Sequence, residues 1–167
     1  FFSGGLGGLG LLTARLLAEG GARQIVLSSR SNRVVAGSES DWVWLAECGT
    51  NVRRVRSDAS DDGSVRATLC ALCGDGLRLS GIFHAAHALA DALLANQHTL
   101  HFRSTYGPKV HGATALHAAS WHAPLRFFNA FSSIAGLMGS AGQAPHSTAS
   151  AWLDAMAGWR HRGGVRA

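Results

Sequence analysis

The chain has very little of the two residue types that would make its chemistry easy to trace. Among its 167 residues there is one tyrosine, Tyr106, and one lysine, Lys109. It has only three cysteines, too few for a disulfide framework in a domain of this length, and no run of about 18 apolar residues marks a membrane span. We therefore expect a soluble, cytoplasmic domain that does not contact a membrane.

Charged residues are also scarce, at 15% of the chain, and the net charge of +5 reflects 15 basic against 10 acidic residues. The basic residues other than Lys109 are arginines scattered along the sequence, without the clustering or interleaved aromatics typical of nucleic-acid binding. The positive charge favours an anionic ligand or an acidic partner protein, or it is a solvated surface. We expect no nucleic-acid partner, an expectation that a steep salt dependence of nucleic-acid binding would contradict.

Short β-like runs alternate with helical stretches along the whole chain. This βαβ rhythm predicts an α/β fold with a Rossmann-type doubly wound parallel sheet. Only Phe1, Phe2 and Ser3 precede the first glycines, so we expect a sheet truncated at both ends and a single domain, residues 1–167, that is a fragment of a larger multidomain chain. The predicted strands are 24–27, 52–56, 81–84 and 125–131, and the predicted helices are 9–18, 41–48, 64–72, 96–119 (interrupted at Pro108) and 147–162.

Glycines dominate the segment in which the first strand is expected to end and the first helix to begin. Gly5, Gly7 and Gly10 have the spacing of a dinucleotide-binding fingerprint. Such glycines allow a tight turn and let backbone N–H groups approach a pyrophosphate at the positive end of a helix. The alternative is a glycine turn that binds nothing. The candidate cofactor-binding residues of this turn are Gly4, Gly5, Gly7, Gly8, Leu9 and Gly10.

The second predicted strand is followed by Arg30, at the point where a dinucleotide-binding fold places an acidic residue on the ribose 2′-hydroxyl of NAD. Arg30 would pair with a 2′-phosphate instead, so the sequence favours NADPH, with Ser29 and Arg30 as binding residues, unless Arg30 is an ordinary surface arginine. Asp58, after the third strand, either accepts a hydrogen bond from the adenine amine or caps the next helix. Residues 1–167 are thus interpreted as one NADP(H)-binding domain.

Five segments carry a family resemblance: Ser3 to Gly10, Ile82 to Ala86, Gly107 to Val110, Phe131 to Gly136 and Gly139 to Ala144. Together they resemble the ketoreductase domain of modular polyketide synthases and animal-type fatty acid synthases, in the short-chain dehydrogenase/reductase superfamily. The resemblance implies that NADPH reduces a β-ketoacyl thioester, held on the phosphopantetheine arm of an acyl carrier protein, to the β-hydroxyacyl form. It also implies other synthase domains as partners. The fourth-strand residues that it places at the cofactor are His84, Ala85 and Ala86.

The family surrounds the substrate carbonyl with a lysine, a serine, a tyrosine and an asparagine. The resemblance assigns the lysine to Lys109 and the serine to Ser133. The tyrosine position is His146 and the asparagine position is Ser150, so two of the four residues differ. Tyr106 does not replace the missing phenol, because it precedes Lys109 by three residues in the same predicted helix. These four positions are the candidate catalytic residues.

His146 changes the proton supply of the expected reaction. A hydride that arrives at a carbonyl carbon leaves charge on the oxygen, which needs a proton donor. Imidazole titrates near neutral pH and can act as an acid, but the Lys109 cation would disfavour its protonated form. Loss of a proton donor lowers rates by roughly 10² to 10⁴. Two interpretations stay open: a reductase impaired at His146, and a catalytically inactive ketoreductase-like structural module of the synthase.

Cys70 and Cys73, together with His84 and His87, have the composition of a zinc-ligand set. The cysteines fall on a predicted helix and His84 ends a predicted strand, so nothing brings the four together and we expect no metal site. The cysteines are interpreted as small buried apolar residues. His87 stands where the family often has a glycine beside the nicotinamide, and Asp91 matches one acid of its Leu-Asp-Asp motif.

Overall fold

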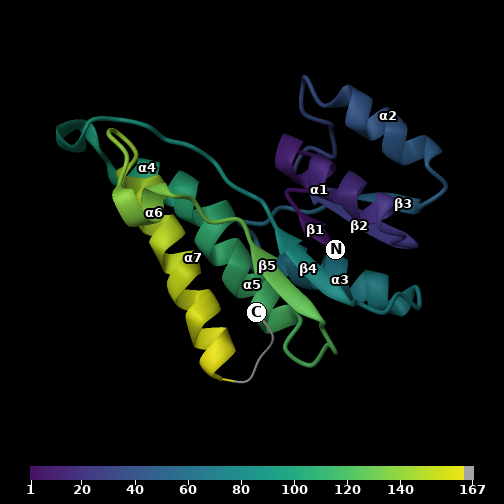
Figure 1. Ribbon diagram of the computed structural model, residues 1–167. Coiled ribbons are helices and arrows are strands. Elements are labelled where there is room, and N and C mark those ends of the chain that lie inside the picture. Colours follow the sequence, from purple (N-terminus) through teal and green to yellow (C-terminus); the bar gives the residue numbers. More distant parts are fainter. Residues whose placement is uncertain (164–167) are drawn as a thin grey trace.

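A computed structural model describes residues 1–163 as a five-stranded parallel sheet flanked by helices (Figure 1). The strand order is β3-β2-β1-β4-β5, and each neighbouring pair is parallel, which confirms the predicted doubly wound α/β arrangement. The strands are β1 (Phe2–Ser3), β2 (Gln24–Ser29), β3 (Asn51–Arg56), β4 (Gly81–His84) and β5 (Phe127–Ala130). The helices are α1 (Gly8–Glu19), α2 (Glu39–Glu47), α3 (Asp62–Gly74), α4 (Thr99–Tyr106), α5 (Gly112–Ala119), α6 (Ala135–Met138) and α7 (Ala144–Arg162).

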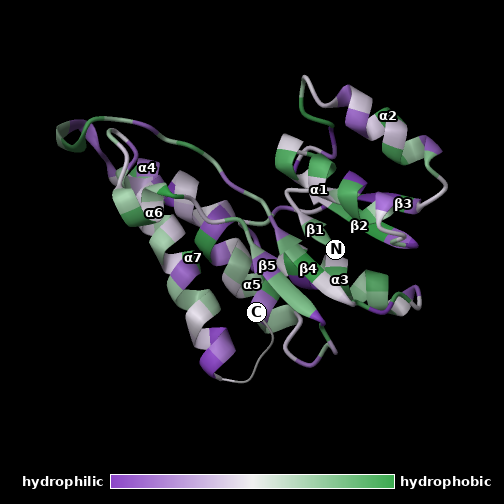
Figure 2. Cartoon of the chain, in the orientation of Figure 1, coloured by the Kyte–Doolittle hydropathy of each residue, from purple (hydrophilic) through white to green (hydrophobic). Residues whose placement is uncertain are grey.

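Two hydrophobic clusters lie on opposite faces of the sheet. Along β2 the side chains alternate, so that Ile25 and Leu27 join the cluster under α1 and α2, and Val26 joins the cluster under α3, α5 and α7. Figure 2 shows hydrophobic residues in the central strands and hydrophilic ones along the edge strand β3. Because helices cover both faces, the central strands read as nearly continuous apolar runs in the sequence.

The direction of strand addition reverses at β1, which pairs with β2 on one side and with β4 on the other. In a parallel sheet, ligands bind in the crevice at such a reversal, beyond the carboxyl ends of the strands. β1 and β4 end at Ser3 and His84, which are partners in register. The glycine turn and the segment after His84 therefore leave the sheet side by side, at the edge where a cofactor is expected.

The helix predicted over 96–119 is interrupted at Pro108, as the sequence indicates. A π-helical turn, Gly107–His111, separates α4 from α5. Proline has no N–H to donate, so it breaks the regular hydrogen-bond ladder at this point. The predicted strands 24–27, 52–56, 81–84 and 125–131 and the other predicted helices are confirmed, with ends displaced by at most three residues. Within residues 1–163, none of the helices has the length and apolar character needed to cross a membrane.

The expectation that the cysteines are buried is wrong for Cys70 and Cys73. Both lie on α3 and are exposed, whereas Cys48 is half-buried. The buried face of α3 consists of Val65, Leu69 and Leu72, which pack on the sheet. One helical position corresponds to about 100° of rotation, so a cysteine next to a buried leucine in the sequence can face solvent.

Candidate active site

The glycine turn brings backbone segments so close together that side chains do not fit. Gly4 has a φ of +74°, in the left-handed region, and a Cβ there would lie 2.5 Å from the backbone nitrogen of Ala86. A Cβ on Gly10 would lie 2.6 Å from the Cα of Gly5. The turn after β1, the start of α1 and the segment after β4 therefore depend on glycine at these positions.

Helix α1 begins beside this turn with an open N-terminus. Its N-cap is Gly7, which has no side chain to satisfy the first N–H groups, and the first turn of the helix contains no acidic residue. Gly8 and Leu9 are exposed there. Free N–H groups and the positive end of the helix dipole attract an anion. The turn therefore fits the pyrophosphate of a dinucleotide cofactor.

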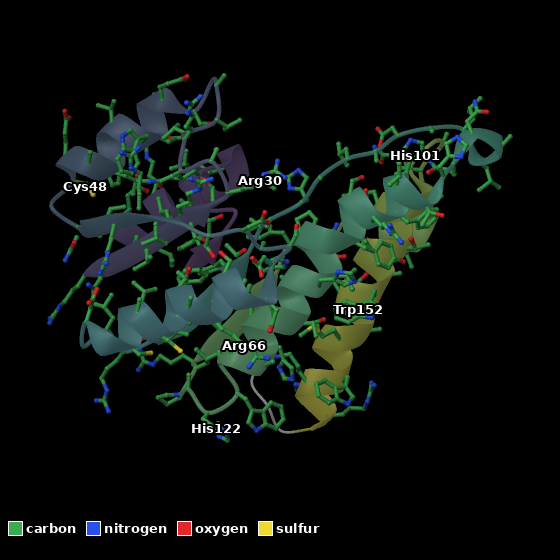
Figure 3. The ribbon with its side chains drawn as sticks, turned by 180° about the vertical axis from the view of Figure 1, so that it is seen from behind. Arg30, Cys48, Arg66, His101, His122 and Trp152 are labelled. Atoms are coloured by element: carbon green, nitrogen blue, oxygen red, sulfur yellow. The ribbon has the colours of Figure 1, made fainter. Side chains whose placement is uncertain are left out.

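Ser29 and Arg30 lie at the carboxyl end of β2, at the same edge of the sheet. The hydroxyl of Ser29 is buried and has no hydrogen-bond partner among residues 1–163. Arg30 is exposed, and Figure 3 shows its side chain projecting away from the strands. A cationic side chain at this position, with an unpaired hydroxyl beside it, fits the phosphorylated ribose of NADPH.

Asp58 follows β3 and uses its carboxylate locally. It accepts a hydrogen bond from the backbone N–H of Ser60 at 2.9 Å. Asp61 caps α3, because its side chain accepts from the backbone N–H of Gly63 at 2.9 Å. The capping role considered for Asp58 therefore belongs to Asp61, and its contact with adenine stays a prediction.

A chain of hydrogen bonds joins Lys109, Ser150 and His146. Lys109 is 2% exposed and donates from Nζ to the Oγ of Ser150 at 2.7 Å. Ser150 Oγ donates in turn to the backbone carbonyl of His146, also at 2.7 Å. Burial lowers the pKa of the Lys109 ammonium group, and the charge of Asp154 opposes that effect. The side chains of Lys109 and Ser150 therefore meet, from the π-helical turn and from α7, and His146 joins them through its backbone carbonyl.

Ser133 lies in the loop between β5 and α6. Its Oγ accepts a hydrogen bond from the backbone N–H of Ala135 at 3.2 Å, so the hydroxyl hydrogen remains available to donate. The neighbouring Ser132 donates to the backbone carbonyl of Ser150 at 3.2 Å. Helix α6 is packed closely on α7, since a Cβ on Gly136 would lie 3.0 Å from the Cβ of Ser150. The serine loop is thereby held against α7.

The imidazole of His146 is half-buried, and its Nδ1 has no hydrogen-bond partner within the described part of the chain. Burial lowers the pKa of this ring, and the charges of Lys109 and His87 lower it further, whereas Asp91 opposes them. A ring whose pKa lies below its ordinary value is mostly neutral at pH 7. It forms hydrogen bonds but carries few readily transferred protons at that pH.

Two loops that sequence reasoning did not connect meet near this group. The backbone N–H of Ala92 donates to the carbonyl of Gly142 at 2.9 Å, and the side-chain amide of Gln97 donates to the carbonyl of Ala92 at 2.7 Å. Gln143 donates to the carboxylate of Asp91 at 3.0 Å across 52 positions of sequence. No local sequence signal identifies such pairs. These bonds fix the position of Asp91, whose charge acts on His146.

Comparison with known proteins decides the family. Residues 1–167 match the family described as the KR domain. The chain belongs to this family. Together with the relatives and solved structures that follow, this match confirms the predicted resemblance to polyketide synthase ketoreductases of the short-chain dehydrogenase/reductase superfamily.

The KR domain is similar to one part of much longer curated proteins. It is 39% identical over 165 residues to a phthioceranic/hydroxyphthioceranic acid synthase of Mycobacterium tuberculosis (strain ATCC 25618 / H37Rv). It is also 39% identical, over 158 residues, to a mycocerosic acid synthase-like polyketide synthase of the same strain. The two matches cover 99% and 95% of this chain, but the chain spans only 8% and 7% of the respective relatives.

Solved ketoreductases share the fold of this KR domain. A ketoreductase domain from the bacillaene assembly line superposes with a TM-score of 0.90 at 34% identity, over 98% of this chain and 39% of that one. The ketoreductase from the first module of phoslactomycin biosynthesis in Streptomyces sp. HK803 gives 0.91 at 32% identity, over 99% and 38%. The Rossmann-type prediction is therefore confirmed.

Proposed function

We propose that this KR domain contributes the cofactor-binding and catalytic residues of an NADPH-dependent β-ketoacyl reductase whose turnover is slowed by His146. Its substrate is a β-ketoacyl thioester on the phosphopantetheine arm of an acyl carrier protein, and the other domains of the synthase are its further partners. The observation that carries the proposal is the hydrogen bond from the Lys109 ammonium group to Ser150, whose hydroxyl donates in turn to the backbone carbonyl of His146. Residues 1–167 are proposed as one domain, of which 164–167 lie outside the described residues.

The cofactor site is assigned by the fit of the residues at the edge of the sheet. NADPH supplies the hydride for the reduction when it is bound. The N–H groups at the start of α1 hold the pyrophosphate, and the closely packed turn at Gly4 keeps them in position. Arg30 pairs with the 2′-phosphate, and the hydroxyl of Ser29 gains the partner that it lacks within residues 1–163. Because arginine rather than a carboxylate follows β2, NADPH is preferred to NADH.

Ser133 and His146 are the groups assigned to the carbonyl oxygen. Ser133 can donate its free hydroxyl hydrogen to the oxygen as negative charge develops there. His146 delivers a proton only as imidazolium, and burial and the Lys109 charge make that form scarce at neutral pH. Protonation of the product alkoxide therefore limits the rate.

The same ring favours a second function, that of a structural module that binds NADPH without turnover. Nδ1 of His146 is buried without a partner in the described chain, so no hydrogen bond at this nitrogen holds the ring in one orientation. The hydroxyl of Ser150 donates to the backbone carbonyl of His146, which leaves it no hydrogen to pass to a relay. Under this alternative the fold organises the synthase and catalyses nothing.

The experiment that separates these functions follows NADPH oxidation with a β-ketoacyl thioester and, in parallel, NADPH binding. It compares the native protein with His146→Ala and His146→Tyr. Turnover that falls in His146→Ala supports the reductase with His146 as its acid. Binding without turnover, restored by His146→Tyr, supports the inactive module and contradicts the reductase. Absence of NADPH binding in the native protein contradicts both.

A further inference from the structure

His84 is a buried titratable residue that the proposed reaction leaves without a role in catalysis. It ends β4, is 1% exposed, and its Nε2 lies 2.9 Å from the backbone carbonyl of Lys109. A carbonyl oxygen only accepts, so the ring donates and the neutral imidazole carries its proton on Nε2. The family resemblance assigns His84 to the cofactor, whereas its ring is directed at the turn that carries Lys109.

In that turn, Gly107–His111, the regular α-helical pattern of backbone hydrogen bonds is interrupted. The backbone N–H of Gly112 is directed at the carbonyls of Gly107 and Lys109, and Pro108 has no N–H to donate. A π-helical turn is wider than an α-helical one, and such turns frequently occur at functional sites. The bond from His84 ties the wide turn, at its central residue, to the end of a core strand.

Space for the ring is provided by the first residue of α5. A Cβ on Gly112 would lie 3.0 Å from the Cε1 of His84 and 2.9 Å from the carbonyl oxygen of Ala59. Burial is the main cause that lowers the pKa of His84 to about 4, and the charges of Lys109 and His87 act in the same direction. The ring is therefore neutral near pH 7, and its Nε2–H donates to the Lys109 carbonyl without titrating at that pH.

We propose that His84 is the positioning residue of Lys109. It fixes the backbone carbonyl of Lys109 to the end of β4, and Ser150 receives the Nζ at the other end of the same residue. Because its backbone carbonyl and its Nζ are both bonded, the Lys109 side chain is held in one orientation, extending from the end of β4 to α7. This inference deepens the proposed function, because it explains how the catalytic ammonium group is kept in place.

Two matched variants test the positioning. The side chain of His84→Gln is long enough to place an amide N–H near the position of Nε2, whereas His84→Asn carries the same amide but is one methylene too short. His111→Gln is the control, because His111 is an exposed histidine in the same turn. All are made in the 167-residue chain, in which Lys109 is the only lysine. Isotope-labelled lysine then gives a single side-chain resonance that reports on Lys109 without any need for activity.

We expect His84→Gln and His111→Gln to keep the native Lys109 resonance and its lowered pKa. In His84→Asn the resonance moves toward that of free lysine, and the Lys109 pKa rises toward its ordinary value of 10.5. The same variant lowers kcat by about 10- to 100-fold with little change in KM for NADPH, because a small displacement of a catalytic group has effects of this size. A loss of stability alone would not produce this split between kcat and KM.

Identical Lys109 resonances in His84→Gln and His84→Asn would overturn the positioning role. If His84→Asn does not fold, Gly112→Ala replaces it, because the new methyl group would lie 3.0 Å from the Cε1 of His84 and displace the ring. A native resonance in folded Gly112→Ala overturns the proposal, and a displaced one supports it. If the Lys109 resonance differs between His84→Gln and His84→Asn as expected, but the native protein shows no turnover, the positioning of Lys109 is supported and the proposed reductase activity is contradicted.

Discussion

The two sides of the candidate site are built from different groups. Toward β1, β2 and α1 the site consists mainly of backbone, held close by Gly4 and Gly10 and ended by the uncapped N-terminus of α1. Toward α5 and α7 it consists mainly of side chains: Lys109 donates to Ser150, and Ser150 donates to the backbone carbonyl of His146. The first side resembles the family pattern closely, and the second departs from it at two of four positions. A site formed by backbone groups is kept as long as the residues of the turn stay small. A site formed by side chains changes its chemistry whenever one of those side chains is substituted.

This contrast implies that binding and turnover can be lost separately. Substitutions on the glycine side should remove cofactor affinity, and those near α7 should alter rate or stability while NADPH still binds. The variants below test this separation, and those at Gly4, Ser150 and Arg30 are each compared with a control of the same residue type.

The largest effect is expected from Gly4→Ala. Its Cβ would lie 2.5 Å from the nitrogen of Ala86 on a backbone with φ +74°, so the turn must open and carry its N–H groups away from the pyrophosphate. We expect NADPH affinity to fall by more than about 100-fold in a fluorescence titration. In the described structure Gly21 has a φ of +86°, and a Cβ on it would have no atom within 4 Å apart from those of its two chain neighbours. Gly21→Ala should therefore lose only about 1 to 2 kcal/mol of stability and bind NADPH normally. Equal loss of binding in both variants would contradict the prediction.

The next effect concerns the proton supplied by His146. The pKa of this ring is lowered by burial, Lys109 and His87, so the imidazolium form increases as the pH falls through that lowered value. We expect native kcat to rise as the solution becomes acidic. His146→Tyr should be faster by about 100-fold at neutral pH, without the acidic rise, because a phenol replaces the ring as donor. A native rate that does not change with pH would remove His146 from the proton supply.

The stability of the fold has to be followed in the same pH series. The folded-state pKa of His84 is about 4, below its ordinary value of 6.5, so the unfolded chain binds a proton more readily between these values. The contribution of His84 is therefore complete above pH 6.5 and is lost progressively as the pH falls toward 4. Chemical denaturation at each pH gives the range in which the rates describe folded protein.

A smaller effect is expected at Ser150, which supports the buried lysine. Ser150→Ala removes the acceptor of the Lys109 Nζ, and an unsatisfied buried donor costs about 1 to 3 kcal/mol. Ser147→Ala is the control on the same helix, since the Ser147 hydroxyl is buried but has no partner within residues 1–163. We expect urea denaturation to show a loss of stability for Ser150→Ala and almost none for Ser147→Ala. The same stability in both would show that the Lys109 bond contributes little.

The fold could be predicted from the sequence because its signals are local. Segment 81–84 is a short apolar run after a helix, as expected of a parallel strand buried on both faces. Pro108 indicates an interruption but not a π-helical turn, and no local pattern predicts that His84 bonds to the Lys109 carbonyl in that turn. The exposure of Cys70 was mispredicted because the neighbours of a residue in sequence do not determine which way it points on a helix.

The candidate site could be predicted only as a set of positions. The family resemblance identified Lys109 and Ser150, but no spacing rule indicated that Ser150 would accept directly from the ammonium group. Nor did the sequence indicate that Gln143 would reach Asp91. Such contacts arise where elements distant in sequence pack together. The contact at Asp91 places a carboxylate whose charge opposes the effects of burial, Lys109 and His87 on the pKa of His146.

The smallest expected effect belongs to Arg30, the cationic side chain assigned to the backbone-made side of the site. Arg30 is exposed, so solvent screens its interaction with a 2′-phosphate, and we expect Arg30→Ala to lower the preference for NADPH over NADH by about 10-fold. Arg33→Ala removes the same charge from an exposed position three residues later and should leave that preference unchanged. Competitive titrations of both cofactors at low and high salt measure it, and the effect of Arg30 should shrink as salt is added. If both variants keep the native preference, Arg30 does not recognise the 2′-phosphate, and the Ser29 hydroxyl and the backbone are left as the groups that do.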